Sequence, residues 1–242
     1  EVYDKGYGKY GPAKGIPELR KALASWINCP EESIMICPGA RFAVYLAINT
    51  LLNPGDEIII IEPAWPAYKD CALNAGIKVR TIKTTLETNW EPSVDQINNA
   101  INENTNMIVL NYPNNPTGTI LPKKIRDDII EIAREHDLYV LSDEIYSDYL
   151  PFFGLKHQPV SVLSCHYEKS IITKSFSKSH AMTGFRIGYA IAEPSIIEKM
   201  SKLQAISLTN VSEPIQYVAL QALKADIHEN TEIIRSRLEV LV

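Results

Sequence analysis

The segment SIITKSFSKSHAMTGFRIGYAIA, residues 170–192, contains two apolar runs separated by a polar stretch with one glycine. Short apolar runs bounded by turn residues are typical of buried strands. We therefore predict strands over Ser170–Thr173 and Ile187–Ala192. The polar residues after the first strand, among them Ser175 and Lys178, then follow its carboxyl end, where ligands bind in open α/β sheets.

An apolar run, a polar break and a stretch of helical periodicity recur along the rest of the chain. Further strands are predicted over Glu57–Glu62, Lys78–Ile82, Asn106–Asn111 and Leu138–Ser142. Helices are predicted over Ile16–Ile27, Ala40–Leu52, Ala67–Ala75, Val94–Ile101, Pro122–His136 and Pro194–Ile206. Several strands are apolar throughout, which is typical of strands covered on both faces. We expect an α/β fold, a three-layer sandwich with a mostly parallel central sheet joined by right-handed crossovers.

Length and composition indicate an ordinary globular protein, with 242 residues of which 45% are hydrophobic and 22% charged. The net charge of −5 and the lack of a long basic run give no electrostatic basis for binding nucleic acid or an anionic membrane. No apolar run approaches the roughly 20 residues that cross a bilayer. The four cysteines, which form no C-x-x-C pair, are Cys29, Cys37, Cys71 and Cys165. We expect a cytoplasmic protein that binds neither nucleic acid nor membrane.

Two other predicted strands also run into polar motifs. One is followed by YPNNPTG, residues 112–118, and the next by Asp143 and Tyr146. Arg186 stands eight residues after Lys178. Taken singly, each motif has a plain structural explanation as a turn, a helix cap or a solvated charge. Their order and spacing together favour a functional site.

These motifs resemble the signature of class I aminotransferases, enzymes of fold type I that depend on pyridoxal 5′-phosphate (PLP). The residues that carry the resemblance are Asn115, Asp143, Tyr146, Ser175, Lys178 and Arg186. The segment SFSKSHAMTGFRIGY, residues 175–189, is similar to the lysine segment of that family almost throughout. The resemblance covers practically the entire chain and is aspartate-aminotransferase-like. It implies an enzyme that moves an amino group between an amino acid and a 2-oxo acid.

The resemblance also implies roles for individual residues. Lys178 would form the Schiff base with PLP and then act as general base and acid on the substrate. Asp143 would pair with the pyridine nitrogen and keep it protonated, which makes the ring a better electron sink. Tyr146 and Asn115 would hydrogen-bond the phenolic oxygen of the ring, and Asn115 would also lie near the substrate carboxylate. No metal site is expected.

A phosphate group is favoured at a helix N-terminus, where backbone N–H groups and the helix dipole attract an anion. By resemblance, Gly39, Ala40 and Arg41 form the phosphate loop at the start of a predicted helix. Ser175 and Arg186 would supply a hydroxyl and a guanidinium. The alternative is a plain turn glycine at position 39 and a solvated side chain at position 41.

Three further roles follow from the resemblance. Trp65 falls where the family stacks an aromatic ring on the cofactor, although tryptophan is also a common core residue. Tyr10 resembles the tyrosine that reaches the phosphate site of a neighbouring subunit, which implies a homodimer. Arg41 matches the position at which dicarboxylate-specific members bind the distal carboxylate with a basic side chain. We therefore expect aspartate or glutamate as donor, with 2-oxoglutarate as acceptor.

We see no internal repeat or linker, and the chains of this family are longer at both ends. We therefore expect residues 1–242 to be the PLP-binding large domain, without the N-terminal arm and the small domain, and such a piece could be inactive alone. Two alternatives stay open. One is a PLP-dependent carbon–sulfur β-lyase on the same scaffold, and the other is the aminotransferase-like sensing domain of a transcription regulator.

Overall fold

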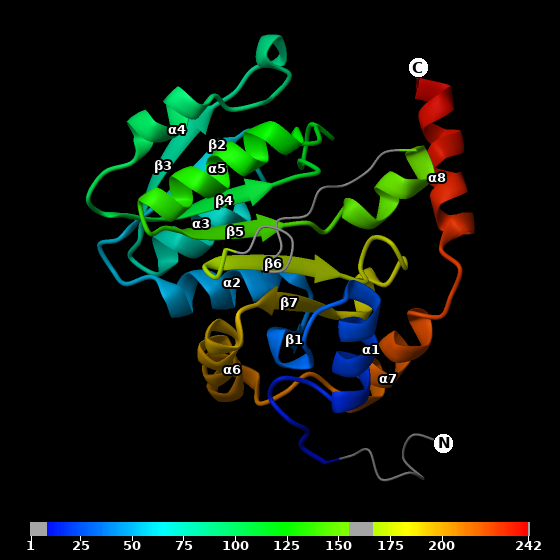
Figure 1. The fold of residues 1–242 in the computed structure, drawn as a ribbon. Coiled ribbons are helices and arrows are strands. Elements are labelled where there is room, and N and C mark those ends of the chain that lie inside the picture. The colour runs from blue at the N-terminus through cyan, green and yellow to red at the C-terminus, as the bar shows by residue number, and fades with distance from the viewer. Residues whose placement is uncertain (1–8, 155–166, 242) are drawn as a thin grey trace.

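The computed structural model describes residues 9–154 and 167–241. Seven strands in these ranges form one sheet in the order β1-β7-β6-β5-β4-β2-β3 (Figure 1). The strands are β1 (Ile34–Cys37), β2 (Glu57–Glu62), β3 (Lys78–Lys83), β4 (Thr105–Asn111), β5 (Tyr139–Asp143), β6 (Ser170–Ser175) and β7 (Gly188–Ala192). The pairs from β3 to β6 are parallel, whereas β7 is antiparallel to both β6 and β1. The predicted α/β fold with a mostly parallel sheet is confirmed.

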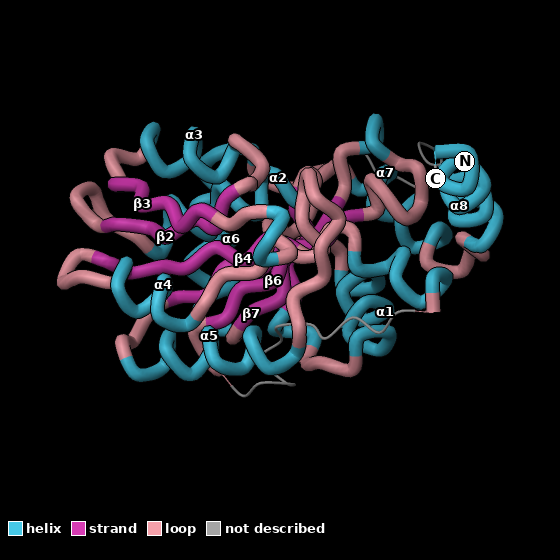
Figure 2. Tube along the Cα trace, turned by 90° about the horizontal axis from the view of Figure 1, so that it is seen from above, coloured by secondary structure: helices cyan, strands magenta, loops and turns pink. Residues whose placement is uncertain are grey.

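Helices cover both faces of this sheet. The α-helices are α1 (Pro17–Ile27), α2 (Ala40–Leu51), α3 (Ala67–Asn74), α4 (Val94–Ala100), α5 (Lys123–Glu135), α6 (Pro194–Leu208), α7 (Glu213–Ala222) and α8 (His228–Leu241). Short 3-10 helices are η1 (Glu31–Ser33), η2 (Leu86–Thr88), η3 (Ser147–Phe153) and η4 (Thr183–Phe185). Seen from above, α2 and α3 lie on one side of the strands and α4 and α5 on the other (Figure 2). This arrangement is the expected three-layer sandwich.

Successive residues of a strand point to opposite faces, and here both faces are buried. In β2, Ile58 and Ile60 join the core under α2 and α3, whereas Ile59 and Ile61 join the core under α4 and α5. All four side chains are buried. This explains why the central strands are apolar throughout rather than alternating.

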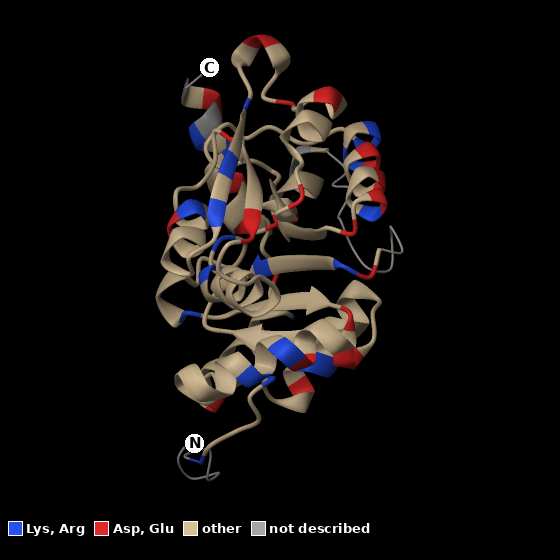
Figure 3. Ribbon diagram, turned by 90° about the vertical axis from the view of Figure 1, so that its left-hand side faces the viewer, with Lys and Arg blue, Asp and Glu red and all other residues tan. Residues whose placement is uncertain are grey.

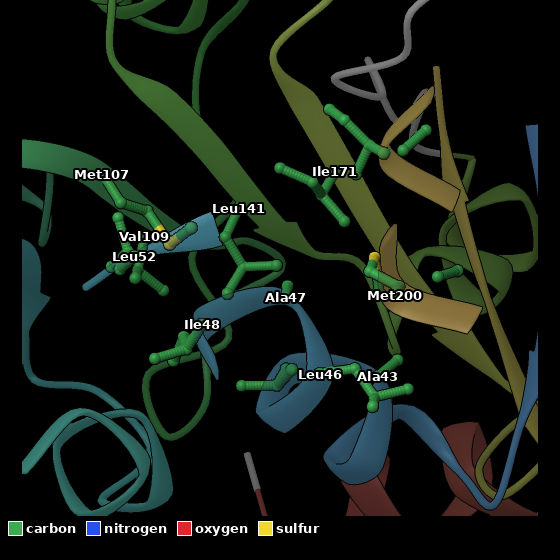
Figure 4. Close-up of a cluster of buried hydrophobic side chains, with 14 of the residues drawn as sticks. Ala43, Leu46, Ala47, Ile48, Leu52, Met107, Val109, Leu141, Ile171 and Met200 are labelled. Atoms are coloured by element: carbon green, nitrogen blue, oxygen red, sulfur yellow. The ribbon is translucent and has the colours of Figure 1, made fainter. Parts of the chain in front are cut away.

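The packing of α2 against the sheet fixes where that helix begins. Its small residues Ala43 and Ala47 lie in the same buried cluster as Leu141 of β5 and Ile171 of β6 (Figure 4). At the start of β7, a Cβ atom on Gly188 would come within 2.8 Å of the backbone nitrogen of Ala40. Glycine at position 188 therefore lets the N-terminus of α2 lie directly against the sheet edge.

Each predicted element is present, with bounds that differ by two residues or fewer. Pro122, expected in the first turn of a helix, instead precedes α5 as its N-cap residue. β7 is antiparallel to β6 because the loop between them, residues 176–187, contains no α-helix that could carry the chain back to the other end of the sheet. The chain therefore enters β7 at the same edge of the sheet at which it leaves β6. β1 and α7 were not predicted. The four apolar residues of β1 are too few to show a period.

Basic and acidic residues are interspersed along the outer helices (Figure 3). On α5, for example, Lys123 pairs with Asp127 and Lys124 pairs with Asp128, so that the partners of each ion pair lie one helical turn apart. Exposed pairs of this kind each contribute about 0.3–0.5 kcal/mol. Within the described ranges, no helix is both long enough and apolar enough to span a bilayer.

Candidate active site

A pocket of about 400 Å³ opens where β4, β5 and β6 end. In Figure 1 the arrowheads of these three strands point to the same edge of the sheet. Eight of the predicted site residues line the pocket: Ala40, Arg41, Trp65, Asn115, Asp143, Tyr146, Lys178 and Arg186. Residues that are more than a hundred positions apart in the chain thus meet in one place, as the parallel topology requires.

Asp143, the last residue of β5, is 4% exposed and accepts three hydrogen bonds from neutral groups. The Tyr68 hydroxyl donates to Oδ2 at 2.6 Å, the Thr173 hydroxyl donates to Oδ1 at 3.1 Å, and the Ile145 N–H donates to Oδ1 at 3.4 Å. Burial raises the pKa of Asp143, and these hydrogen bonds oppose that rise. Among the described residues, we find no ion pair to this carboxylate. The pocket therefore presents a buried acceptor that a cationic group of a ligand would complete.

Lys178 and Tyr146 face each other in the pocket. Lys178 lies in the loop after β6, and its Nζ is 5.7 Å from the centre of the Tyr146 ring. Tyr146 precedes η3, and its pKa is raised by burial and then by the nearby charge of Asp143. The pocket thus combines a primary amine, a phenol and a carboxylate.

The N-terminus of α2 forms another wall. Gly39 is the N-cap residue with φ 84°, and the first turn of the helix has neither an acidic residue nor a side-chain cap. Arg186 lies beside it, with Nη1 donating to the Thr183 carbonyl at 2.8 Å and Nη2 3.5 Å from the Pro38 carbonyl oxygen. Backbone N–H groups and a guanidinium held together in this way favour an anion such as phosphate.

The two serines after β6 lie differently. Ser177 lines the pocket, whereas Ser175, the predicted phosphate ligand, is buried and does not line it. The Ser175 hydroxyl lies 2.9 Å from the Ile187 carbonyl oxygen and 2.8 Å from the Ser177 hydroxyl. Of these two serines, only Ser177 lines the pocket, and the Ser175 hydroxyl hydrogen-bonds to it. Contact of Ser175 with a phosphate stays a prediction.

Arg41 and Trp65 form one side of the pocket. The guanidinium carbon of Arg41 lies 4.8 Å from the centre of the Trp65 ring, a cation–π contact. Both side chains line the pocket, as the functional interpretation of each requires. Tyr10, in contrast, is 88% exposed and does not line this pocket. Its contact with a neighbouring subunit stays a prediction.

A profile of the family described as "Aminotransferase class I and II" matches residues 3–242. The chain belongs to this family. It is 38% identical over 229 residues to the aspartate aminotransferase of Pyrococcus horikoshii, an alignment that covers 92% of this chain and 58% of that protein. It is 35% identical over 231 residues to aromatic-amino-acid aminotransferase 2 of Thermococcus litoralis, covering 93% of this chain and 59% of that protein.

The fold agrees with that of solved aminotransferases. The structure of Thermus thermophilus aspartate aminotransferase with maleate superimposes with a TM-score of 0.91 at 31% identity. The superposition covers 99% of this chain and 65% of that chain. The aminotransferase chain described here therefore spans about three fifths of the length of the curated relatives it matches.

Five residues of this pocket were not predicted from the sequence: Tyr68, Asn111, Ile145, Ser177 and Thr183. Asn111 ends β4, and its side-chain amide donates to the Asn115 carbonyl at 3.1 Å. The rule that identified Asp143, a polar residue at the end of an apolar strand, also applies to Asn111. Tyr68 carried no such signal, because it lies in a helix and meets Asp143 through the tertiary fold.

Proposed function

We propose that this chain supplies the PLP site and the proton-transfer residues of an aminotransferase. The observation that carries the proposal is that one pocket holds the Lys178 amine, the buried Asp143 carboxylate and the Arg186 guanidinium at a helix N-terminus. The family and the activities of the relatives named above support the same function. No observation favours the β-lyase or the regulator over it.

The residues of the pocket fit PLP. Asp143 is a buried carboxylate that needs a cationic partner, which a protonated pyridine nitrogen would be. Arg186 and the uncapped N-terminus of α2 fit a phosphate group, with Ser177 and Ser175 as hydroxyls nearby. Lys178 offers the primary amine that condenses with an aldehyde. When bound, PLP supplies the electron sink that stabilises negative charge at the substrate α-carbon.

The roles of the side chains follow from this placement. Lys178 would hold the cofactor, and its Nζ would move the proton of the substrate Cα as general base and then acid. Asp143 would hold the ring nitrogen protonated by its charge. Tyr146 and Asn115 would donate hydrogen bonds to the ring oxygen, and Trp65 would contact the ring.

We further propose that Arg41 binds the distal carboxylate of aspartate or glutamate. Its position at the pocket wall, beside Trp65, allows a bidentate contact with a carboxylate. Names of relatives agree, since aspartate aminotransferases are among them and the Thermus thermophilus structure contains maleate, a dicarboxylate. The acceptor would then be 2-oxoglutarate.

The proposal extends to the assembly. Tyr10 would complete the phosphate site of a second copy, so the active form would be a homodimer. Residues 1–242 would form the large, PLP-binding domain of each subunit. A location in the cytoplasm stays a prediction from the cysteine pattern.

A spectroscopic experiment tests the function. Purified full-length protein should absorb visible light after PLP is added, and the absorbance should decrease when the correct amino acid is added. The donor should yield its 2-oxo acid, and a second 2-oxo acid should restore the absorbance and gain the amino group. Failure to bind PLP would contradict the proposal. Release of ammonia together with a thiol would instead indicate the β-lyase.

A further inference from the structure

Tyr68 joins two residues of the candidate active site. It lies in the first turn of α3 and is 1% exposed. Its hydroxyl donates to Oδ2 of Asp143 at 2.6 Å, a length typical of a hydrogen bond to a charged oxygen. Its ring meets Trp65 edge-on, with 5.3 Å between the centroids and 88° between the planes. One buried side chain therefore contacts both the carboxylate and the aromatic wall of the pocket.

The environment of Asp143 shows why this contact matters. Burial raises the pKa of Asp143, and the hydrogen bond from Tyr68 comes first among the contacts that lower it. The other donors are the Thr173 hydroxyl and the Ile145 N–H, which both bond to Oδ1. A lysine or arginine in the place of Tyr68 would neutralise the carboxylate and compete with a cationic ligand. The phenol of Tyr68 stabilises the negative charge of Asp143 without neutralising it, so the carboxylate can still attract a cationic ligand.

We propose that Tyr68 is a positioning residue that holds Asp143 ionised and fixes the orientation of its carboxylate toward the pocket. The proposal rests on the proposed function, in which that carboxylate meets a protonated ring nitrogen. Tyr68 restrains Oδ2 and Thr173 restrains Oδ1, so hydroxyl groups hold both oxygens of the carboxylate. Among the described donors, Oδ2 accepts only the Tyr68 hydroxyl and keeps a lone pair for the ligand, whereas Oδ1 also accepts the Ile145 N–H.

The affinity of the full-length protein for PLP, measured across pH for wild type and Tyr68→Phe, tests the proposal. Without the phenol, Asp143 should take up a proton at higher pH and lose its attraction for the ring nitrogen. We expect PLP binding near pH 7 to weaken about tenfold, the effect of losing one hydrogen bond to a charged group. The acidic limb of the pH profile, the range in which PLP affinity falls as Asp143 is protonated, should move to higher pH. A role in packing alone would weaken binding equally at every pH.

Tyr167→Phe is a matched control. Tyr167 is also a buried phenol, but its hydroxyl bonds to the carbonyl oxygens of Ala133 and Leu138 and does not line the pocket. This variant should lose stability without moving the acidic limb. Thr173→Val should move the limb in the same direction as Tyr68→Phe, whereas Thr173→Ser should leave it in place.

Infrared spectra of the cofactor-free protein give a readout that does not depend on the proposed function. The band of the protonated carboxyl of Asp143, assigned by its loss in Asp143→Asn, should appear at higher pH in Tyr68→Phe than in wild type. If wild type binds no PLP but this band moves, the proposed function fails and the role of Tyr68 stands. If PLP binds and neither the band nor the acidic limb moves, the inference about Tyr68 is overturned alone.

Discussion

Gly39 and Arg186 lie so close together that a Cβ atom at position 39 would be 2.7 Å from Nη2 of Arg186. Gly39 also has φ 84° and ψ 162°, a backbone region that is essentially restricted to glycine. Both observations oppose any side chain at this position. The glycine is therefore required where the guanidinium approaches the N-terminus of α2, which is where the phosphate of PLP is proposed to bind.

Gly39→Ala should accordingly lower the stability of the protein and displace Arg186. We expect a loss of about 1–3 kcal/mol in the free energy of unfolding, from the backbone strain. PLP affinity, measured by equilibrium dialysis, should fall in addition. Gly55→Ala is the control, because Gly55 has φ 99° but nothing within 4 Å of its Cβ position. Equal losses of PLP affinity in both variants would show that contact with Arg186 is irrelevant.

Lys178 is predicted to carry the cofactor. Borohydride reduction of the PLP-loaded protein, followed by peptide mapping, should place the phosphopyridoxyl label on Lys178. Lys178→Ala should abolish the covalent link, whereas Lys202→Ala, at an exposed position of α6, should keep it. A label on any other lysine of the wild-type protein would refute the assignment.

Asp143 should matter more for catalysis than for stability. Asp143→Asn keeps the shape of the side chain but removes the charge that holds the ring nitrogen protonated. Turnover should fall on the order of a hundredfold or more while the protein still folds and binds PLP. Steady-state kinetics on the loaded variant measure this, and full activity would remove Asp143 from the chemistry.

The pH dependence of stability offers a second test of Asp143. Because burial raises its pKa in the folded state above the unfolded value, its contribution to stability is fully present below the unfolded pKa and is lost as pH rises through the folded pKa. The free energy of unfolding of the cofactor-free wild type, relative to Asp143→Asn, should therefore decrease from acidic to neutral pH. Urea unfolding at several pH values measures it. If this difference increased with pH instead, the hydrogen bonds to Asp143 would outweigh the effect of its burial in the cofactor-free protein.

The sequence predicted the parts of this site that depend on topology. Asp143 and Lys178 follow apolar strands, and the carboxyl ends of parallel strands meet at one edge, so their proximity could be expected before any coordinates. Topology alone does not predict which of two neighbouring polar residues, such as Ser175 and Ser177, lines the pocket. Both Ser175 and Ser177 follow β6, and the contact of Ser175 with the Ile187 carbonyl decides which hydroxyl faces the pocket. That contact depends on how the loop returns to β7.

Tyr68 shows the same limit for a helix. Its bond to Asp143 joins residues 75 positions apart and depends on how α3 packs against the end of β5. No local pattern encodes that distance. β1 is a further case, since its four apolar residues fit a strand or a helix equally well until β7 pairs with it.

The last prediction concerns substrate choice and rests on Arg41. The helix dipole mildly disfavours a cation in the first turn of α2, and a solvated side chain would be the ordinary outcome. The Arg41 side chain is exposed, and its guanidinium lies over Trp65 at the pocket wall. The indole ring holds it there without neutralising its charge, so the guanidinium stays available for a carboxylate. This placement favours a role in binding an acidic substrate.

Arg41→Ala should therefore reduce kcat/KM for aspartate about tenfold to a hundredfold, the effect of losing a hydrogen-bonded charge pair worth about 1.5–3 kcal/mol. The value for alanine or an aromatic amino acid should change little. The kcat/KM of Arg41→Lys for aspartate should lie between the values of wild type and Arg41→Ala, because lysine keeps the charge but cannot bind a carboxylate in a bidentate manner. Arg134→Ala is the control, since it removes a similar arginine that lies 5.1 Å from the Tyr167 ring and does not line this pocket. If the ratio of aspartate to alanine kcat/KM is the same in Arg41→Ala as in wild type, Arg41 does not contact the substrate, and the selectivity for acidic donors must come from residues elsewhere in the enzyme.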